Sequence, residues 1–155
     1  MNGDPHLGLS QCPDPARFKF AFVRHPLNWY QSYWQFKMTY GWDERNPFDL
    51  GCRSDNFLQF IENMLAGYPG FYSKGLIAFV GKGSSEIDFI GRYENLVEDL
   101  ISALRMAGEG FDESIIRQMP PFNVSNKSRF PAEYRAELRQ RVTETEQETM
   151  ERFGY

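Results

Sequence analysis

The sequence predicts a helix-rich α/β fold in which a parallel sheet is flanked by helices. Two stretches, Phe18–Met38 and Ile87–Ala107, each join a short apolar run to an amphipathic helical pattern. Strands that alternate with helices are typical of parallel sheets, because a helix carries the chain back to the start of the next strand. With 155 residues and 41% hydrophobic content, residues 1–155 are predicted to form a single domain.

The first stretch is predicted to be a strand, Phe18–Arg24, and a helix, Leu27–Met38. The strand is aromatic and β-branched, and Arg24-His25-Pro26 breaks it. Pro26 suits the first turn of a helix. The apolar residues that follow fall on one helical stripe: Leu27, Tyr30, Trp34 and Met38. Arg24 is therefore expected at the carboxyl end of a strand, the edge where open α/β sheets bind ligands.

The second stretch repeats this pattern with a strand at Ile87–Arg92 and a helix at Leu96–Ala107. Asn95 is a fair N-cap for the helix, and Gly108 closes it. The helix has a continuous apolar stripe, formed by Leu96, Val97, Leu100, Ile101 and Leu104. Both strands are therefore expected to run parallel, each with a helix behind it.

The region between these stretches is predicted to hold a loop and two helices. Thr39–Arg53 contains Gly, Asn and Pro and is predicted to be a loop. Trp42 at its tip either packs over the preceding helix, which we favour, or stacks on a sugar. Ser54 is expected to cap a helix from Asp55 to Ala66, and Phe71–Val80 is expected to form a short helix.

The final part is predicted to be helical at both of its ends. Asp112 is expected to cap a short helix through Gln118, with an inward face made of Ile115, Ile116 and Met119. A last helix is expected after Pro131, with a narrow apolar stripe made of Tyr134, Leu138 and Val142. The remainder of Glu133–Arg152 is charged, and such a run is usually solvated.

Composition and charge exclude several classes. The formal charge of −4 gives no support for nucleic-acid binding. Cys12, Cys52 and the two histidines make a poor metal-ligand set, so no metal is expected. The chain has no apolar run long enough to span a membrane and opens with no signal-peptide pattern, which favours a cytoplasmic location and no membrane partner.

Two segments carry a family resemblance. Arg24-His25-Pro26 followed by Ser32 resembles the 3′-phosphate-binding motif of sulfotransferases, and Arg92-Tyr93-Glu94-Asn95-Leu96 with Asp99 resembles their R-Y-E-[DN]-L-x-x-D segment. The resemblance implies that Arg24 and Ser32 bind the 3′-phosphate of 3′-phosphoadenosine 5′-phosphosulfate (PAPS), and that Tyr93 lies against its adenine. An Arg fork and an aromatic face suit these tasks. The plainer interpretation, in which Arg24 and Tyr93 merely end strands, stays open.

Weaker matches extend the resemblance over nearly the whole chain. Asn123-Val124-Ser125 resembles an N-x-S segment of carbohydrate sulfotransferases, which implies that Ser125 and Lys127 lie near the 3′-phosphate. His6 precedes the first strand at a family-like distance, which implies a general base on the acceptor hydroxyl. A solvated histidine in an irregular segment is the alternative for His6.

The resemblance implies a partial P-loop-type three-layer sulfotransferase fold that corresponds to the carboxyl-terminal portion of the family's domain. It implies transfer of a sulfuryl group from PAPS to a hydroxyl acceptor, with a saccharide as the family-level expectation. The loop that binds the 5′-phosphosulfate is missing, because nothing before His6 supplies it. Either the chain lacks its beginning or it is a remnant that kept the fold, and we expect little activity from it alone.

Two further expectations depend on that missing loop. The strand that carries the loop is expected to lie between the two strands present here, and its absence is expected to favour self-association through exposed strand edges.

A non-catalytic nucleotide-binding or interaction domain is the alternative function. A kinase-like enzyme is a third class, which the R-x-P…S and R-Y-E segments disfavour.

Overall fold

The computed structural model describes residues 16–82, 87–122, 124 and 127–155. The chain divides into two compact units, each made of two chain segments. Unit 1 comprises Lys74–Pro120 and the chain up to Arg24, and unit 2 comprises His25–Ser73 and Pro121–Tyr155. Helix α4 (Phe71–Val80) begins in unit 2 and ends in unit 1.

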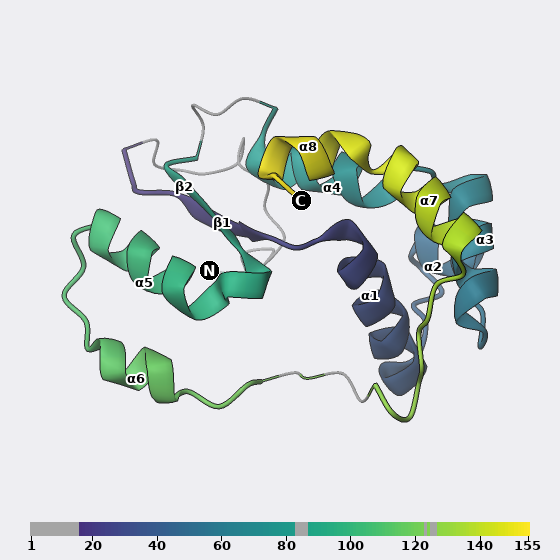
Figure 1. Cartoon of the computed structure of the whole chain (residues 1–155), viewed down its shortest axis with the longest axis horizontal. Coiled ribbons are helices and arrows are strands. Elements are labelled where there is room, and N and C mark those ends of the chain that lie inside the picture. The colour runs from purple at the N-terminus through teal and green to yellow at the C-terminus, as the bar shows by residue number, and fades with distance from the viewer. Residues whose placement is uncertain (1–15, 83–86, 123, 125–126) are drawn as a thin grey trace. The chain divides into compact units, whose positions relative to one another are not determined.

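Unit 1 contains a two-stranded parallel sheet, as predicted (Figure 1). Strand β1 (Phe20–Val23) pairs with β2 (Phe89–Arg92) in a register that places Phe20 opposite Phe89 and Val23 opposite Arg92. A short 3₁₀ turn, η2 (Tyr93–Asn95), then leads into α5 (Leu96–Met106), and α6 (Glu113–Gln118) follows. The coarse α/β prediction is confirmed, with strands shorter than expected.

The two strands are hydrogen-bonded neighbours. In this chain β1 and β2 therefore pair directly, and the place of a further strand between them stays a prediction. Gly91 shows how closely α5 approaches the sheet, since a Cβ there would lie 2.6 Å from the Phe22 ring and 2.8 Å from Asp99 Cβ. Any larger residue at position 91 would push α5 away from β2.

Unit 2 is helical. Its elements are α1 (Pro26–Tyr40), α2 (Pro47–Cys52), α3 (Phe57–Gly67), the start of α4, α7 (Ala136–Thr145) and α8 (Gln147–Phe153). These helices enclose an aromatic and aliphatic core that includes Leu27, Tyr30, Trp34, Phe48, Phe57, Phe60, Ile61, Met64, Leu138 and Val142. The predicted stripe of the first helix is buried at Leu27, Tyr30 and Trp34.

The predicted loop at Thr39–Arg53 contains a helix, so that part of the prediction is wrong. The Asn46 side chain accepts hydrogen bonds from the amides of Phe48 (2.9 Å) and Asp49, and Pro47 starts the helix. Asn-Pro was thus a cap followed by a first-turn proline, a helix start and not loop punctuation. The Trp42 ring lies 5.9 Å from the Phe60 ring of α3, so it packs on a later helix, and packing over the preceding helix stays a prediction.

Two further boundaries differ from the predictions. Asn56, and not Ser54, caps α3, because its side chain accepts from the Gln59 amide. The charged run at the carboxyl end forms two helices that meet at Glu146, and Glu146 is fully buried and not solvated.

The predicted inward face of α6 is also wrong. The Ile115 and Met119 side chains are 63% and 64% exposed. Ion pairs of Arg117 with Glu98 and of Arg105 with Glu113 join α6 to α5.

No helix in the described part of the chain is long and apolar enough to cross a membrane.

Candidate functional site

Arg24 and Tyr93 come together where the two strands end. Because Val23 lies opposite Arg92 in the parallel register, the residues that follow them emerge at the same edge of the sheet. The Arg24 guanidinium carbon lies 4.6 Å from the centre of the Tyr93 ring, a cation–π distance. Both residues belong to unit 1.

Asp99 organises the turn that presents Tyr93. One of its carboxylate oxygens accepts from the Arg92 amide (2.6 Å), and the other accepts from the Asn95 side chain (2.7 Å). These two bonds join the end of β2 to the first turn of α5, across the segment that carries Tyr93. Sequence reasoning assigned no role to Asp99, although its place in the R-Y-E-N-L-x-x-D pattern marked it.

The Arg24–Tyr93 pair has the chemistry for an anionic, planar ligand. Tyr93 is 45% exposed, and the guanidinium lies over one face of its ring. A planar group would therefore have to stack on the opposite ring face. A guanidinium held beside an aromatic ring can take a phosphate or sulfate while the ring takes a base.

The structure does not bring all of the predicted site residues into one unit. Ser32 lies half-buried on α1, and Lys127 is exposed, both in unit 2. His6 and Ser125 lie outside the described residues. Their roles stay predictions, as does the shared cleft for Arg24, Ser32 and Tyr93.

His25 has a structural role that sequence reasoning missed. Its Nδ1 atom accepts a hydrogen bond from the Leu27 amide (3.2 Å), so it caps the start of α1 ahead of Pro26. Its ring also lies 5.0 Å from the Tyr155 ring. A side-chain acceptor directly before a helix-starting proline was the available signal.

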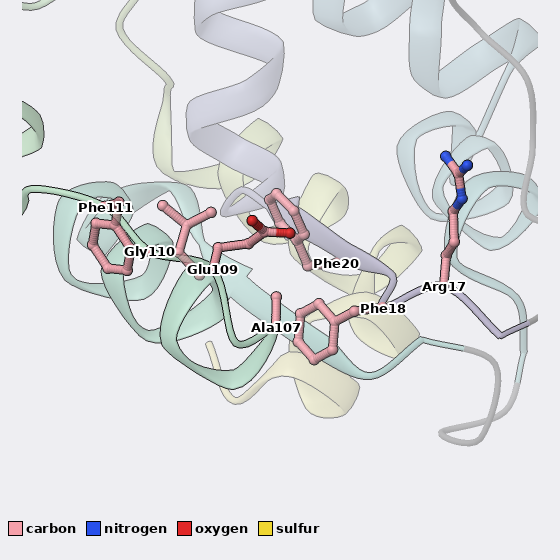
Figure 2. Close-up of a pocket in the computed structure, with 8 residues that line it drawn as sticks. Arg17, Phe18, Phe20, Ala107, Glu109, Gly110 and Phe111 are labelled. Carbon is pink, nitrogen blue, oxygen red and sulfur yellow. The ribbon is translucent and has the colours of Figure 1, made fainter.

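A hollow of about 660 Å³ in unit 1 is not at this site. Residues from the start of β1 and the end of α5 line it, together with the segment after α5: Arg17, Phe18, Phe20, Leu104, Ala107, Glu109, Gly110 and Phe111 (Figure 2). Arg24 and Tyr93 emerge from the opposite ends of the strands. The hollow and the Arg24–Tyr93 pair are therefore separate features.

Among the described residues, no group of three or more His, Cys, Asp or Glu side chains is placed to hold a metal ion. Scans against protein-family models, curated proteins and solved structures found no match to the chain.

Proposed function

We propose that the chain binds a 3′-phosphorylated adenine nucleotide at the carboxyl ends of β1 and β2, as part of a sulfotransferase that uses PAPS. The observation that carries the proposal is the contact between Arg24 and Tyr93. Each residue belongs to a different family-like segment of the sequence, and the parallel register brings the two segments to one edge. The proposed fold is the partial P-loop-type sulfotransferase fold.

In this proposal Arg24 holds the 3′-phosphate with its fork of donors, and Tyr93 stacks on the adenine. Ser32, Ser125 and Lys127 add a hydroxyl or a positive charge to the same phosphate. Arg24 and Tyr93 would position the donor and take no part in bond making, so their loss would weaken donor binding.

The reaction would be an in-line transfer. A base, proposed to be His6, takes the proton of an acceptor hydroxyl, and that oxygen attacks sulfur. The bond from sulfur to the 5′-phosphate oxygen breaks, and 3′-phosphoadenosine 5′-phosphate leaves. A saccharide acceptor and a cytoplasmic location belong to the same proposal. A further segment has to supply the 5′-phosphosulfate loop, since helix N-termini and glycine-rich backbone hold such groups.

A non-catalytic nucleotide-binding domain is the second candidate. The Arg24–Tyr93 pair supports nucleotide binding by either candidate. Assays of this chain with labelled PAPS and a panel of saccharides separate the two. Turnover supports the sulfotransferase. If this chain and a chain supplemented with a loop segment both bind nucleotide without turnover, the result supports the non-catalytic binding domain.

The test of the site is a titration with 3′-phosphoadenosine 5′-phosphate and, separately, with adenosine 5′-phosphate. For the wild type, we expect the first nucleotide to bind more tightly than the second. Arg24→Ala should cost about 1.5–3 kcal/mol with the 3′-phosphorylated nucleotide, because a charged hydrogen bond is lost. The same change should leave the affinity for adenosine 5′-phosphate almost unchanged.

Arg45→Ala is the matched control, because the Arg45 side chain is 93% exposed and pairs with Asp43 at the tip of a unit 2 loop. It should not alter either affinity. The assignment fails if Arg24→Ala weakens both nucleotides equally, or if the wild type does not discriminate between them.

A further inference from the structure

Strand β1 has an outer edge whose hydrogen-bonding groups follow from the register. The Phe89 amide donates to the Lys19 carbonyl (3.2 Å). In a parallel ladder this directs the backbone groups of Ala21 and Val23 toward β2, and those of Phe20 and Phe22 toward the opposite edge. Among the described residues, no strand pairs with that edge.

The outer edge of β2 is protected differently. The Arg92 amide points away from β1 and donates to the Asp99 carboxylate. In addition, α5 packs against β2. Exposed strand edges tend to recruit another strand unless they are covered or charged, and among the described residues no strand protects the outer edge of β1.

An aromatic row lies along the same strand. Side chains two residues apart point to one face, and the rings of Phe18, Phe20 and Phe22 contact one another in sequence, at centroid distances of 6.4 Å and 5.9 Å. Phe20 is 42% exposed. Figure 2 shows Phe18 and Phe20 on the wall of the hollow of about 660 Å³, with the end of α5 and Phe111 across from them.

The edge is complementary to itself. When two copies of β1 pair antiparallel about a two-fold axis at Ala21, Phe20 of each copy lies opposite Phe22 of the other copy. Both residues present an N–H and a C=O outward, so each pair exchanges two hydrogen bonds. The two aromatic rows then lie side by side as cross-strand pairs.

Charge also fits this arrangement. The same two-fold axis places Lys19 opposite Val23 and Arg24 opposite Phe18. No like charges face each other directly, and such pairs would be destabilising. The product is a four-stranded sheet with the order β2-β1-β1-β2, whereas two strands alone are marginal.

We propose that the outer edge of β1 is a self-association surface, on which a second copy of this chain pairs β1 to β1 in antiparallel orientation about Ala21. The contact is isologous, so it closes at the dimer. It uses the edge and aromatic row of β1 and does not depend on the proposed nucleotide site.

The first experiment is sedimentation velocity over a range of concentrations. The apparent mass should rise from 18.1 kDa toward twice that value. Phe20→Lys should move this transition to concentrations higher by about tenfold or more, because charged edges resist pairing. Phe36→Lys is the matched control, since Phe36 is 51% exposed on α1, and it should leave the transition in place. Far-UV circular dichroism verifies that both variants fold.

The second experiment tests the register and does not need Phe20→Lys to fold. In a Cys12→Ser background, Ala21→Cys should form a covalent dimer on mild oxidation, because Ala21 faces its own counterpart. Lys19→Cys should not, since the two introduced cysteines would lie four residues apart along the strands, roughly 13 Å. The native Cys52 is buried.

A chain that stays monomeric at all concentrations overturns the proposal. A dimer that Phe20→Lys does not weaken places the contact elsewhere and overturns it as well. Equal crosslinking at positions 19 and 21 rules out pairing about Ala21.

Discussion

Unit 2 has a large buried apolar core, whereas few of the large apolar side chains of unit 1 are buried, the others being half-buried or exposed. The buried apolar residues of unit 2 include Phe48, Phe57, Phe60, Ile61, Met64, Leu138 and Val142, and those of unit 1 are Val23, Val80, Ile101 and Ala103, within the described residues. Unit 1 exposes Phe20, Phe79, Tyr93, Leu96, Val97, Met106, Ile115 and Met119. Parallel sheets normally have both faces covered. The contrast indicates that unit 2 carries most of the fold's stability, and unit 1 carries both of the proposed interaction sites.

The polar interactions of the two units also differ, because unit 2 contains a buried polar network and the ion pairs of unit 1 lie at the surface. Glu146 in unit 2 is fully buried, and it accepts hydrogen bonds from the Tyr30 hydroxyl and from both the amide (2.9 Å) and the hydroxyl (2.5 Å) of Ser73. Thr149 extends this network by donating to the Ser73 hydroxyl. Unit 1 instead uses surface ion pairs such as Arg117 with Glu98, which contribute little to stability.

The largest expected effect comes from a comparison of two phenylalanine-to-alanine changes, one in each unit. Phe60→Ala should lower the free energy of unfolding by about 3–5 kcal/mol, because Phe60 is fully buried. Phe20→Ala should cost far less, since Phe20 is 42% exposed. All three tryptophans lie in unit 2, so urea unfolding followed by tryptophan fluorescence reports on that unit. Equal shifts for the two variants would contradict the contrast.

The next effect concerns the buried carboxylate. Glu146→Gln keeps the shape but points an amide group at donors, so we expect a loss of about 1.5–3 kcal/mol in the tryptophan-detected transition. Glu148→Gln, an exposed residue of α8 two positions further along the chain, is the control and should change little. An unaltered transition for Glu146→Gln would mean that the network adds nothing to the stability of unit 2.

Short sequence patterns correctly predicted the features that neighbouring residues determine. Arg24-His25-Pro26 marked the junction between β1 and α1, because proline both ends strands and starts helices. The parallel pairing followed from two strand–helix repeats. The adjacency of Arg24 and Tyr93 followed in turn, because residues after parallel strands emerge at one edge.

Long-range packing decided the rest. Glu146 looked like one more solvated charge, and only its partners Tyr30 and Ser73, distant in sequence, make it a core residue. The apolar residues of α6 looked inward by spacing alone, yet Ile115 and Met119 are exposed, and Arg117 and Glu113 of α6 pair with Glu98 and Arg105 of α5. The division into two units has no sequence signal, since each unit combines distant segments and the boundary passes within α4.

Alkaline pH should also act on unit 2 first. Burial raises the pKa of the Cys52 thiol to about 12 from 9.0, and the pKa values of Tyr30, Tyr33 and Tyr134 are raised mainly by burial too. The folded chain thus holds these protons more tightly than the unfolded chain. The contribution of Cys52 is complete below pH 9 and is lost between pH 9 and 12, and that of the tyrosines is lost only from pH 10 upward.

From pH 9 to pH 10, Cys52 alone should remove about 1 kcal/mol from the tryptophan-detected free energy of unfolding. Cys52→Ala should make the stability of unit 2 less sensitive to pH across this interval. The same slope in both proteins would show that the thiol takes no part.

The smallest effect is expected at the turn that presents Tyr93 in unit 1. Asp99→Asn keeps one acceptor oxygen but loses the charge that binds the Arg92 amide and the Asn95 side chain. Tyr93 would then be less firmly positioned, and affinity for 3′-phosphoadenosine 5′-phosphate should fall on the order of twofold to fivefold, a cost of less than one hydrogen bond to a charged group. Asp112→Asn is the matched control, because Asp112 caps α6 through the Ser114 amide (2.8 Å) and does not contact the Tyr93 turn. Neither change should move the tryptophan-detected transition, since both lie in unit 1. An affinity loss with Asp112→Asn as large as with Asp99→Asn would mean that any weakening of unit 1 impairs binding, and Asp99 would then have no specific role in positioning Tyr93.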